Sequence, residues 1–195
     1  QLSFTGEVGV QRPLKMPRPL SGYQYAYLLN EALQNIGEAP AYSAADFAAY
    51  RNGENPFTHP DVDWYNTVFQ ESAPISSFNL NASGGGKVAR YSVSLNYLNQ
   101  EGHFKTLDVN SYRTNIELDR YLFTSNIDID VTDDFKMSLN LFGRIQEGVQ
   151  PGAGSSNILN NMYVTPNNAY PIYNPDDSYG GSVTFTNNLY QQALN

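Results

Sequence analysis

The chain has 195 residues, of which 41% are hydrophobic and only 15% charged, with a net charge of −8 and no cysteine. The acidic balance argues against nucleic acid as a partner, because phosphate binding requires lysine and arginine. The lack of cysteine excludes disulfides and thiolate metal sites. Low charge with 15 tyrosines and 10 phenylalanines suits a barrel wall between lipid and a polar lumen. A tyrosine-rich soluble β-domain that binds sugar fits this composition equally well.

Residues 1–11 begin inside an alternating pattern, Leu2-Ser3-Phe4-Thr5, which predicts a first strand. No signal peptide precedes it, so we expect an internal or processed piece of an exported protein. No apolar run approaches the roughly 18 residues that a membrane-spanning helix needs.

Residues 12–74 are predicted to be a partly helical excursion. Ser21 is a candidate N-cap for a helix to about Asn35, and Ser43, with Asp46 three residues later, is a candidate cap for a second helix. A helical turn is expected over 63–71. We expect the first helix to pack through one apolar stripe, formed by Tyr25, Leu28, Leu29, Ala32, Leu33 and Ile36.

Four later stretches alternate apolar and polar residues: 78–82, 91–97, 123–131 and 135–141. Short turns at 83–87 and 132–134 separate them, whereas the opposite connections are far longer. Residues 75–147 are therefore predicted to form barrel strands in two antiparallel hairpins, since short turns at one end and long loops at the other are typical of outer-membrane β-barrels. The fold class is mainly β, part of a transmembrane barrel.

The alternation changes phase near Tyr121, since Leu118 and Leu122 are apolar at even positions and Ile127 and Ile129 at odd ones. This change predicts a β-bulge or a break. Residues 148–195 are predicted to be a long extracellular loop, in which the patch 182–186 indicates a further strand.

Alternation also divides the strand residues between two faces. The residues predicted to face lipid are Phe78, Leu80, Val93, Leu95, Ile127, Ile129, Met137 and Leu139. The candidate lumen-facing residues, able to hydrogen-bond substrate, are Asn96, Asn126, Asp128, Asn140 and Arg144. A soluble module would instead bury the apolar set against a second sheet.

We find no pattern that predicts catalysis, a cofactor or a metal site. His59 and His103 lie in separate loops without a nucleophile pattern nearby. The run 84–87 lacks the spacing of a phosphate-binding loop and fits a hairpin turn. Trp64, the one tryptophan, could stack on a sugar, but an anchoring role in its loop is favoured.

Five runs of the sequence carry a resemblance to a known family: Asp63-Trp64-Tyr65, Ser72-Ala73-Pro74, Ser83-Gly84-Gly85, Arg90-Tyr91-Ser92-Val93-Ser94-Leu95-Asn96-Tyr97 and Ser125-Asn126-Ile127-Asp128-Ile129-Asp130. Together they resemble the SusC-like (RagA-like) family of TonB-dependent outer-membrane transporters. The resemblance covers roughly residues 1 to 150.

This resemblance implies the first strands of a large barrel in the outer membrane of a Gram-negative bacterium. It also implies import of glycans or peptides, energy from TonB acting through a plug region outside this sequence, and a SusD-like surface lipoprotein as partner, besides outer-membrane lipid. The alternatives are a soluble carbohydrate-binding β-module and a glycan-degrading enzyme. The enzyme would need a pair of acidic residues that the sequence does not offer.

Overall fold

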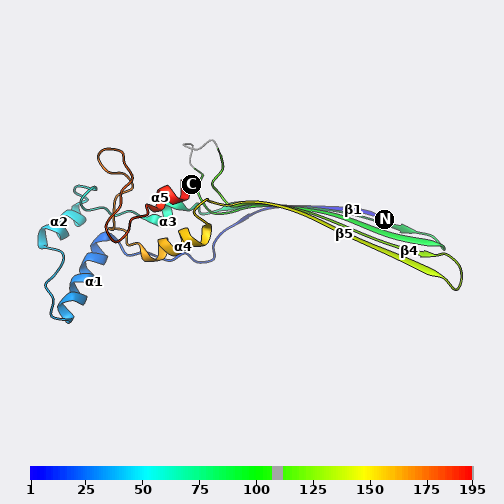
Figure 1. Ribbon diagram of the computed structural model, residues 1–195, viewed down its shortest axis with the longest axis horizontal. Coiled ribbons are helices and arrows are strands. Elements are labelled where there is room, and N and C mark those ends of the chain that lie inside the picture. The colour runs from blue at the N-terminus through cyan, green and yellow to red at the C-terminus, as the bar shows by residue number, and fades with distance from the viewer. Residues whose placement is uncertain (107–111, 195) are drawn as a thin grey trace. The chain divides into compact units, whose positions relative to one another are not determined.

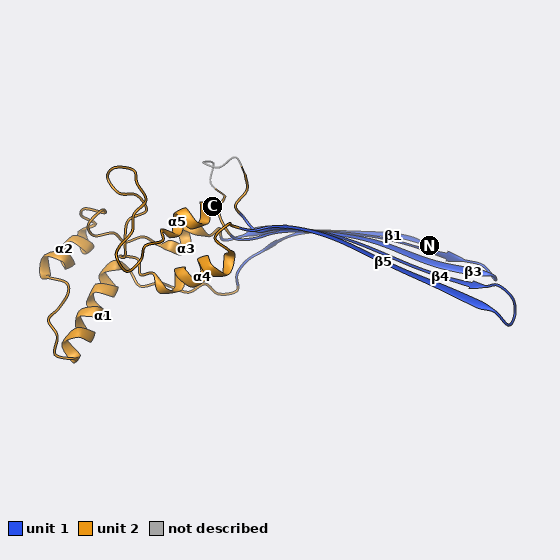
Figure 2. Ribbon diagram, in the orientation of Figure 1, with its two compact units in different colours: residues 1–13, 71–103, 115–150 blue, residues 14–70, 104–114, 151–195 orange. Residues whose placement is uncertain are grey.

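The computed structural model describes residues 1–106 and 112–194 and divides into two compact units (Figures 1 and 2). The first unit contains the strands, and the second contains the helices. The stretches of each unit are Gln1–Pro13, Glu71–His103 and Asn115–Gln150 for the first, and Leu14–Gln70, Phe104–Thr114 and Pro151–Asn195 for the second.

The first unit is one antiparallel sheet in which each strand pairs with the next along the chain. Its strands are β1 (Leu2–Gln11), β2 (Ala73–Gly85), β3 (Ala89–Glu101), β4 (Glu117–Asp130) and β5 (Lys136–Val149). The predicted strands and hairpins are confirmed, and β2 to β5 are somewhat longer than their alternating stretches. At 13 or 14 residues each, they exceed the 9 to 11 residues that cross a bilayer.

The connections differ sharply between the two ends of the sheet. The β2–β3 turn closes with a hydrogen bond from Gly86 N to Ala89 O at 2.7 Å, and the β4–β5 turn with one from Val131 N to Phe135 O at 2.9 Å. The long connections follow β1 and β3, which end at the opposite end of the sheet from the short turns. Strand β5 ends there too and is followed by the long segment 150–194. The alternation of short and long connections is therefore as predicted.

Strand β4 is continuous, so the predicted bulge or break near Tyr121 is wrong. Every residue of β4 pairs in unbroken register with β5, and Tyr121 itself lies opposite Tyr97 and Ile145. Leu118 and Leu122 are apolar residues on the mainly polar face. The phase of the strand never changes, because two fully paired neighbours fix the backbone whatever side chains it carries.

The second unit contains five helices among the described residues. They are α1 (Gly22–Asn35), α2 (Ala44–Asn52), α3 (Trp64–Val68), α4 (Ser155–Val164) and α5 (Leu189–Leu194). Ser21 caps α1 in a capping box with Gln24, and Ser43 caps α2 with Asp46, as predicted for both serines. Gly53 ends α2 in the left-handed conformation at φ 66°. No helix in the described ranges has the length and apolar character to cross a membrane.

Helix α1 packs through only part of the predicted apolar stripe, since Tyr25, Leu29 and Leu33 are half-buried. Its buried residues are Gly22, Ala26 and Asn30, whereas Leu28 and Ile36 are exposed. A Cβ at Gly22 would lie 2.9 Å from the Tyr50 ring. The small residues on this face of α1 let neighbouring side chains approach the helix closely. The polar and aromatic neighbours, rather than the apolar periodicity of α1, therefore decide which face is buried.

The core of the second unit gathers residues that are far apart in the sequence. Trp64 packs on Tyr170 with ring centroids 4.8 Å apart, and both side chains are 1% exposed. Ile158 from α4 and Leu189 from α5 are completely buried in the same unit. The further strand predicted at 182–186 is wrong, because this patch forms no strand, and the predicted long loop 148–195 contains α4 and α5 within its described residues. That patch turns through a bond from Ser182 N to Phe185 O at 2.9 Å.

Candidate functional site: a sheet with two faces

The sheet has one apolar and one polar face, and its pairing register decides which residues share each. Phe78, Leu80, Val93, Leu95, Ile127, Ile129, Met137 and Leu139 all occupy one face, here the apolar face. Leu80, for example, lies opposite Leu95, and Leu95 opposite Phe123. The described strands form a single sheet, and these side chains are partly or largely exposed. No second sheet covers them within the described chain.

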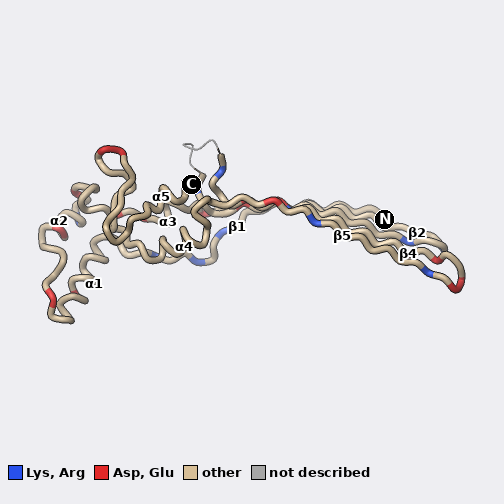
Figure 3. The backbone as a smooth tube through the Cα atoms, in the orientation of Figure 1, with Lys and Arg blue, Asp and Glu red and all other residues tan. Residues whose placement is uncertain are grey.

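In the middle of the sheet the apolar face carries no charge, and Arg144 lies on the polar face at the border of this zone. The windows 2–5, 79–83, 92–96, 122–126 and 140–143 contain no Asp, Glu, Lys or Arg. These windows lie side by side across the five strands. Figure 3 shows most of the charged positions toward the two ends of the strands, with a Lys or Arg position nearer the middle. A charge-free central zone is what a wall inside hydrocarbon requires, because a charge there costs several kcal/mol.

Four aromatic rings form a line across the apolar face, which we call the ring ladder: Phe4, Phe78, Tyr97 and Tyr121. Their successive centroids are 6.3, 6.3 and 4.8 Å apart. Beyond the ladder, toward the long connections, the same face carries paired carboxylates, Asp119 opposite Glu147 and Glu101 opposite Glu117. On β3 to β5 the ladder therefore marks the limit of the apolar zone toward the long connections.

The apolar zone extends along β4 from Tyr121 in the ladder to Ile129 near the hairpin turn. Ile129 is eight positions after Tyr121, which at about 3.3 Å per residue is about 26 Å along the strand. A tilt of about 40° reduces this to about 20 Å along a membrane normal, close to the apolar band of about 25 Å in outer-membrane barrels. The apolar face therefore has the dimensions of a membrane-facing band.

All five candidate lumen residues lie on the polar face, but they are spread along it. Asn96 and Arg144 flank Leu122 in one row. Asn126 and Asn140 lie opposite each other four residues further down, about 13 Å along the strand. Asp128 lies beyond them and accepts a hydrogen bond from Ser138 Oγ at 2.6 Å. The five form a polar strip rather than one compact binding site.

The polar face also carries residues that the sequence did not single out. Near the hairpin turns, Asp130 lies 3.4 Å from Arg90 and 3.7 Å from Lys136. Toward the other end, Arg120 lies between Leu98 and Gln146. Phe142 is 71% exposed on this face. Arg120 has an even number, as do the other polar-face residues of β4, and this could have predicted its face. The apparent phase change at Tyr121 concealed that relation.

In the second unit, Ser43, Asp46 and His59 lie together without the order of a catalytic triad. His59 Nε2 lies 2.8 Å from Asp46 Oδ1, and Ser43 Oγ donates to Asp46 Oδ2 at 2.7 Å. In a triad the histidine lies between the serine and the acid, whereas here both partners bind the carboxylate. These bonds hold the pKa of Asp46 down at about 2, with His59 the largest cause. The arrangement caps α2 and ties it to the following loop.

Trp64 has no exposed ring face to offer a sugar. It is 1% exposed, its Nε1 donates to Pro166 O at 3.4 Å, and it follows the Asp63 cap of α3. This burial supports its interpretation as an anchor. Among the described residues, no group of three or more His, Asp or Glu side chains is placed to hold a metal ion.

Known proteins similar to this chain fall into one class. No family model matches it. TonB-dependent receptor P3 of Formosa agariphila is 33% identical over 147 residues, which cover 70% of this chain and 14% of that protein. The chain is similar to a fragment of a SusC-like (RagA-like) TonB-dependent transporter. TonB-dependent receptor P26 of the same organism is 29% identical over 158 residues, or 76% of the chain and 14% of the relative.

Two solved structures share the fold of this chain. The structure of the RagAB peptide transporter matches with a TM-score of 0.54 and 18% identity, over 76% of this chain and 18% of that one. The RagAB peptide importer in the closed-closed state matches with a TM-score of 0.54 and 17% identity, over 91% and 21%. The sheet is thus an open part of a barrel wall. The relatives are receptors and transporters rather than enzymes, in agreement with the prediction.

Proposed function

We propose that this chain forms part of the wall and extracellular loops of an outer-membrane transporter that imports glycans or peptides. The observation that carries the proposal is the charge-free zone of the sheet, apolar on one face and bounded by the ring ladder. The chain spans 14% of the length of its curated relatives, so transport belongs to the longer protein. Both solved structures are of the peptide transporter RagAB, which favours peptide as the first substrate to test.

In this function the apolar face contacts lipid and the polar face lines the lumen. Asn96, Asn126 and Asn140 offer amide donors and acceptors, and Asp128 and Arg144 add a carboxylate and a guanidinium. These groups suit the hydroxyls of a sugar or the amides of a peptide, and no bond needs to be made or broken. Energy comes from TonB through a plug region, and a SusD-like surface lipoprotein covers the extracellular side, as the family resemblance implies.

The test is where the native protein is found and what accompanies it. Membranes are extracted with mild detergent, separated by gel filtration and analysed by mass spectrometry. We expect a large, detergent-dependent outer-membrane particle that contains this chain, further barrel sequence and a surface lipoprotein. A water-soluble species without detergent would overturn the proposal and favour the carbohydrate-binding module.

Substrate is tested separately by uptake into cells. Labelled oligopeptides and labelled oligosaccharides are supplied to wild-type cells and to cells with Arg144→Ala and Asn140→Ala in the full-length protein. We expect slower uptake of one substrate class with unchanged protein levels, since both side chains are on the polar face. Unchanged uptake of both classes would remove these two residues from the substrate path.

A further inference from the structure

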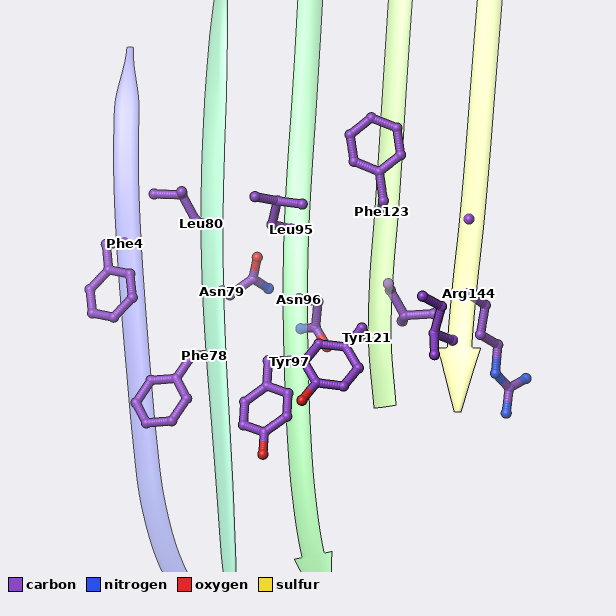
Figure 4. Close-up of a pocket in the computed structure, with 13 residues that line it drawn as sticks. Phe4, Phe78, Asn79, Leu80, Leu95, Asn96, Tyr97, Tyr121, Phe123 and Arg144 are labelled. Carbon is purple, nitrogen blue, oxygen red and sulfur yellow. The ribbon is translucent and has the colours of Figure 1, made fainter. Parts of the chain in front are cut away.

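The apolar face is hollowed next to the ring ladder (Figure 4). The hollow has a volume of about 520 Å³, and its lining includes Leu80, Leu95, Phe123 and Gly143. Gly143 lies opposite Phe123 in the pairing of β4 with β5. Its neighbours in the row carry leucine and phenylalanine, so the missing side chain at Gly143 opens the space.

The conformation of Gly143 does not require glycine. Its φ is not positive, and the nearest atom to an added Cβ would be Phe123 Cβ at 3.9 Å, an ordinary van der Waals distance. Gly6, in the next row, differs because the Phe78 ring would lie 3.2 Å from its Cβ. At Gly6 an aromatic ring fills the space over the glycine, whereas at Gly143 the space is open.

The lining on this face is hydrocarbon. Leu80, Leu95 and Phe123 contribute apolar side chains, and Tyr97 turns its hydroxyl to Asp119 at 2.6 Å. Asn96 and Arg144 also border the hollow, but the register assigns their side chains to the polar face. Nothing in the row offers charge complementarity to a polar ligand. The matching occupant is a flexible apolar chain.

We infer that this hollow binds the hydrocarbon tail of a membrane lipid and retains it longer than the rest of the apolar face does. The inference rests on the proposed function, because the face must be turned toward lipid. The hollow lies one row below the ladder, about 7 Å along the strand, where lipid tails are the surrounding medium. Rings and leucines on several sides give a tail many more dispersion contacts than a flat wall gives.

The inference is tested on the full-length transporter in phosphatidylcholine vesicles that contain a tracer phosphatidylcholine with a photoreactive acyl chain. One sample is irradiated in the vesicles. A second is extracted into detergent, washed with unlabelled phosphatidylcholine and then irradiated. Labelled residues are mapped by mass spectrometry. In the vesicles we expect label at both Phe123 and Leu139. After washing, we expect label at Phe123 to remain and label at Leu139 to be lost.

Gly143→Leu fills the hollow and should abolish the retained label at Phe123 while leaving the label obtained in vesicles at Leu139 unchanged. Gly148→Leu is the matched control, because it makes the same change on the same strand but on the polar face, and it should keep the retained label. Gly143→Ala adds only one methyl group and serves as a second variant in case Gly143→Leu fails to fold. It should reduce the retained label.

The outcomes separate the two ideas. If washing removes label equally from Phe123 and Leu139, or if both Gly143 variants keep it, the retained lipid is disproved while the lipid-facing sheet stands. If neither residue is labelled even in vesicles, the apolar face does not meet lipid, and the proposed function fails as well.

Discussion

Tyr97 donates its phenolic hydrogen to Asp119 Oδ1 at 2.6 Å across the β3–β4 pair, and Asn99 Nδ2 donates to the same oxygen at 3.1 Å. Tyr97 belongs to the ring ladder, and Asp119 is in the first row of carboxylates above it. The last aromatic row and the first charged row are therefore joined directly. A tyrosine with its ring among apolar groups and its hydroxyl on a carboxylate suits a membrane interface.

The first prediction concerns this hydrogen bond. Tyr97→Phe and Asp119→Ala are made singly and together in the full-length protein, and unfolding from vesicles is followed in urea. We expect the effects of the two changes to be non-additive, because each change removes the same hydrogen bond to a charged acceptor. Asn99→Ala combined with Tyr97→Phe is the control, since these two share only the acceptor. Additive effects of Tyr97→Phe and Asp119→Ala would mean that the bond adds nothing to stability.

The second prediction compares adjacent residues on opposite faces. Val93 is on the apolar face near its middle row, and Ser94 is on the polar face. In the full-length protein Val93→Arg should cost about 2–4 kcal/mol of folding free energy in a bilayer, the depth-dependent cost of arginine facing lipid. Ser94→Arg, the matched control, should cost far less because its side chain reaches a polar lumen. Equal costs would refute the assignment of faces.

The third prediction concerns pH. The pKa of Asp46 is lowered to about 2 in the folded chain by hydrogen bonds from His59 and Ser43. Stabilisation by this carboxylate is therefore complete above its unfolded pKa of about 4 and is lost as the pH falls toward about 2. Amide hydrogen exchange of α2 should be faster in Asp46→Asn than in wild type at about pH 5, and the difference should shrink as the pH is lowered.

The control for this experiment is Asp176→Asn, since the pKa of Asp176 is also lowered, chiefly by Ser178. That change lies in another loop and should leave exchange in α2 as in wild type. A difference between Asp46→Asn and wild type that persists undiminished at the lowest pH would show that the ionised carboxylate is not its source.

The fourth prediction concerns the anchor role of Trp64. Trp64→Ala should lower the exchange free energies of α3 and α5 by about 3–5 kcal/mol, because truncating a buried tryptophan leaves a large cavity. Trp64→Phe, which retains an aromatic ring against Tyr170, should cost less. Val183→Ala is the control, since Val183 is fully exposed in the same unit. Stability unaffected by Trp64→Ala would favour a ligand-binding role over an anchoring one.

Local signals in the sequence predicted the strands, the turns and two helix starts well. Ser21 with Gln24 and Ser43 with Asp46 form their capping boxes within three residues, so no distant part of the chain is needed. The alternation of side chains along a strand likewise needs no distant part of the chain, so the sequence predicted correctly that Leu95 and Asn96 lie on opposite faces. Helices α4 and α5 were missed, because Ile158 and Leu189 are buried by partners remote in sequence, and the short apolar pattern around each is weak by itself.

Alternation by itself determined that this chain has apolar and polar strand faces, since successive side chains of a strand point to opposite sides. Only the tertiary structure decided how those faces align between strands. Pairing with β3 and β5 kept β4 continuous through Tyr121 despite the change in its apolar pattern. The same pairing brought Phe4, Phe78, Tyr97 and Tyr121 into one ladder and placed Gly143 opposite Phe123. Register is a property of neighbouring strands, and the sequence of one strand does not contain it.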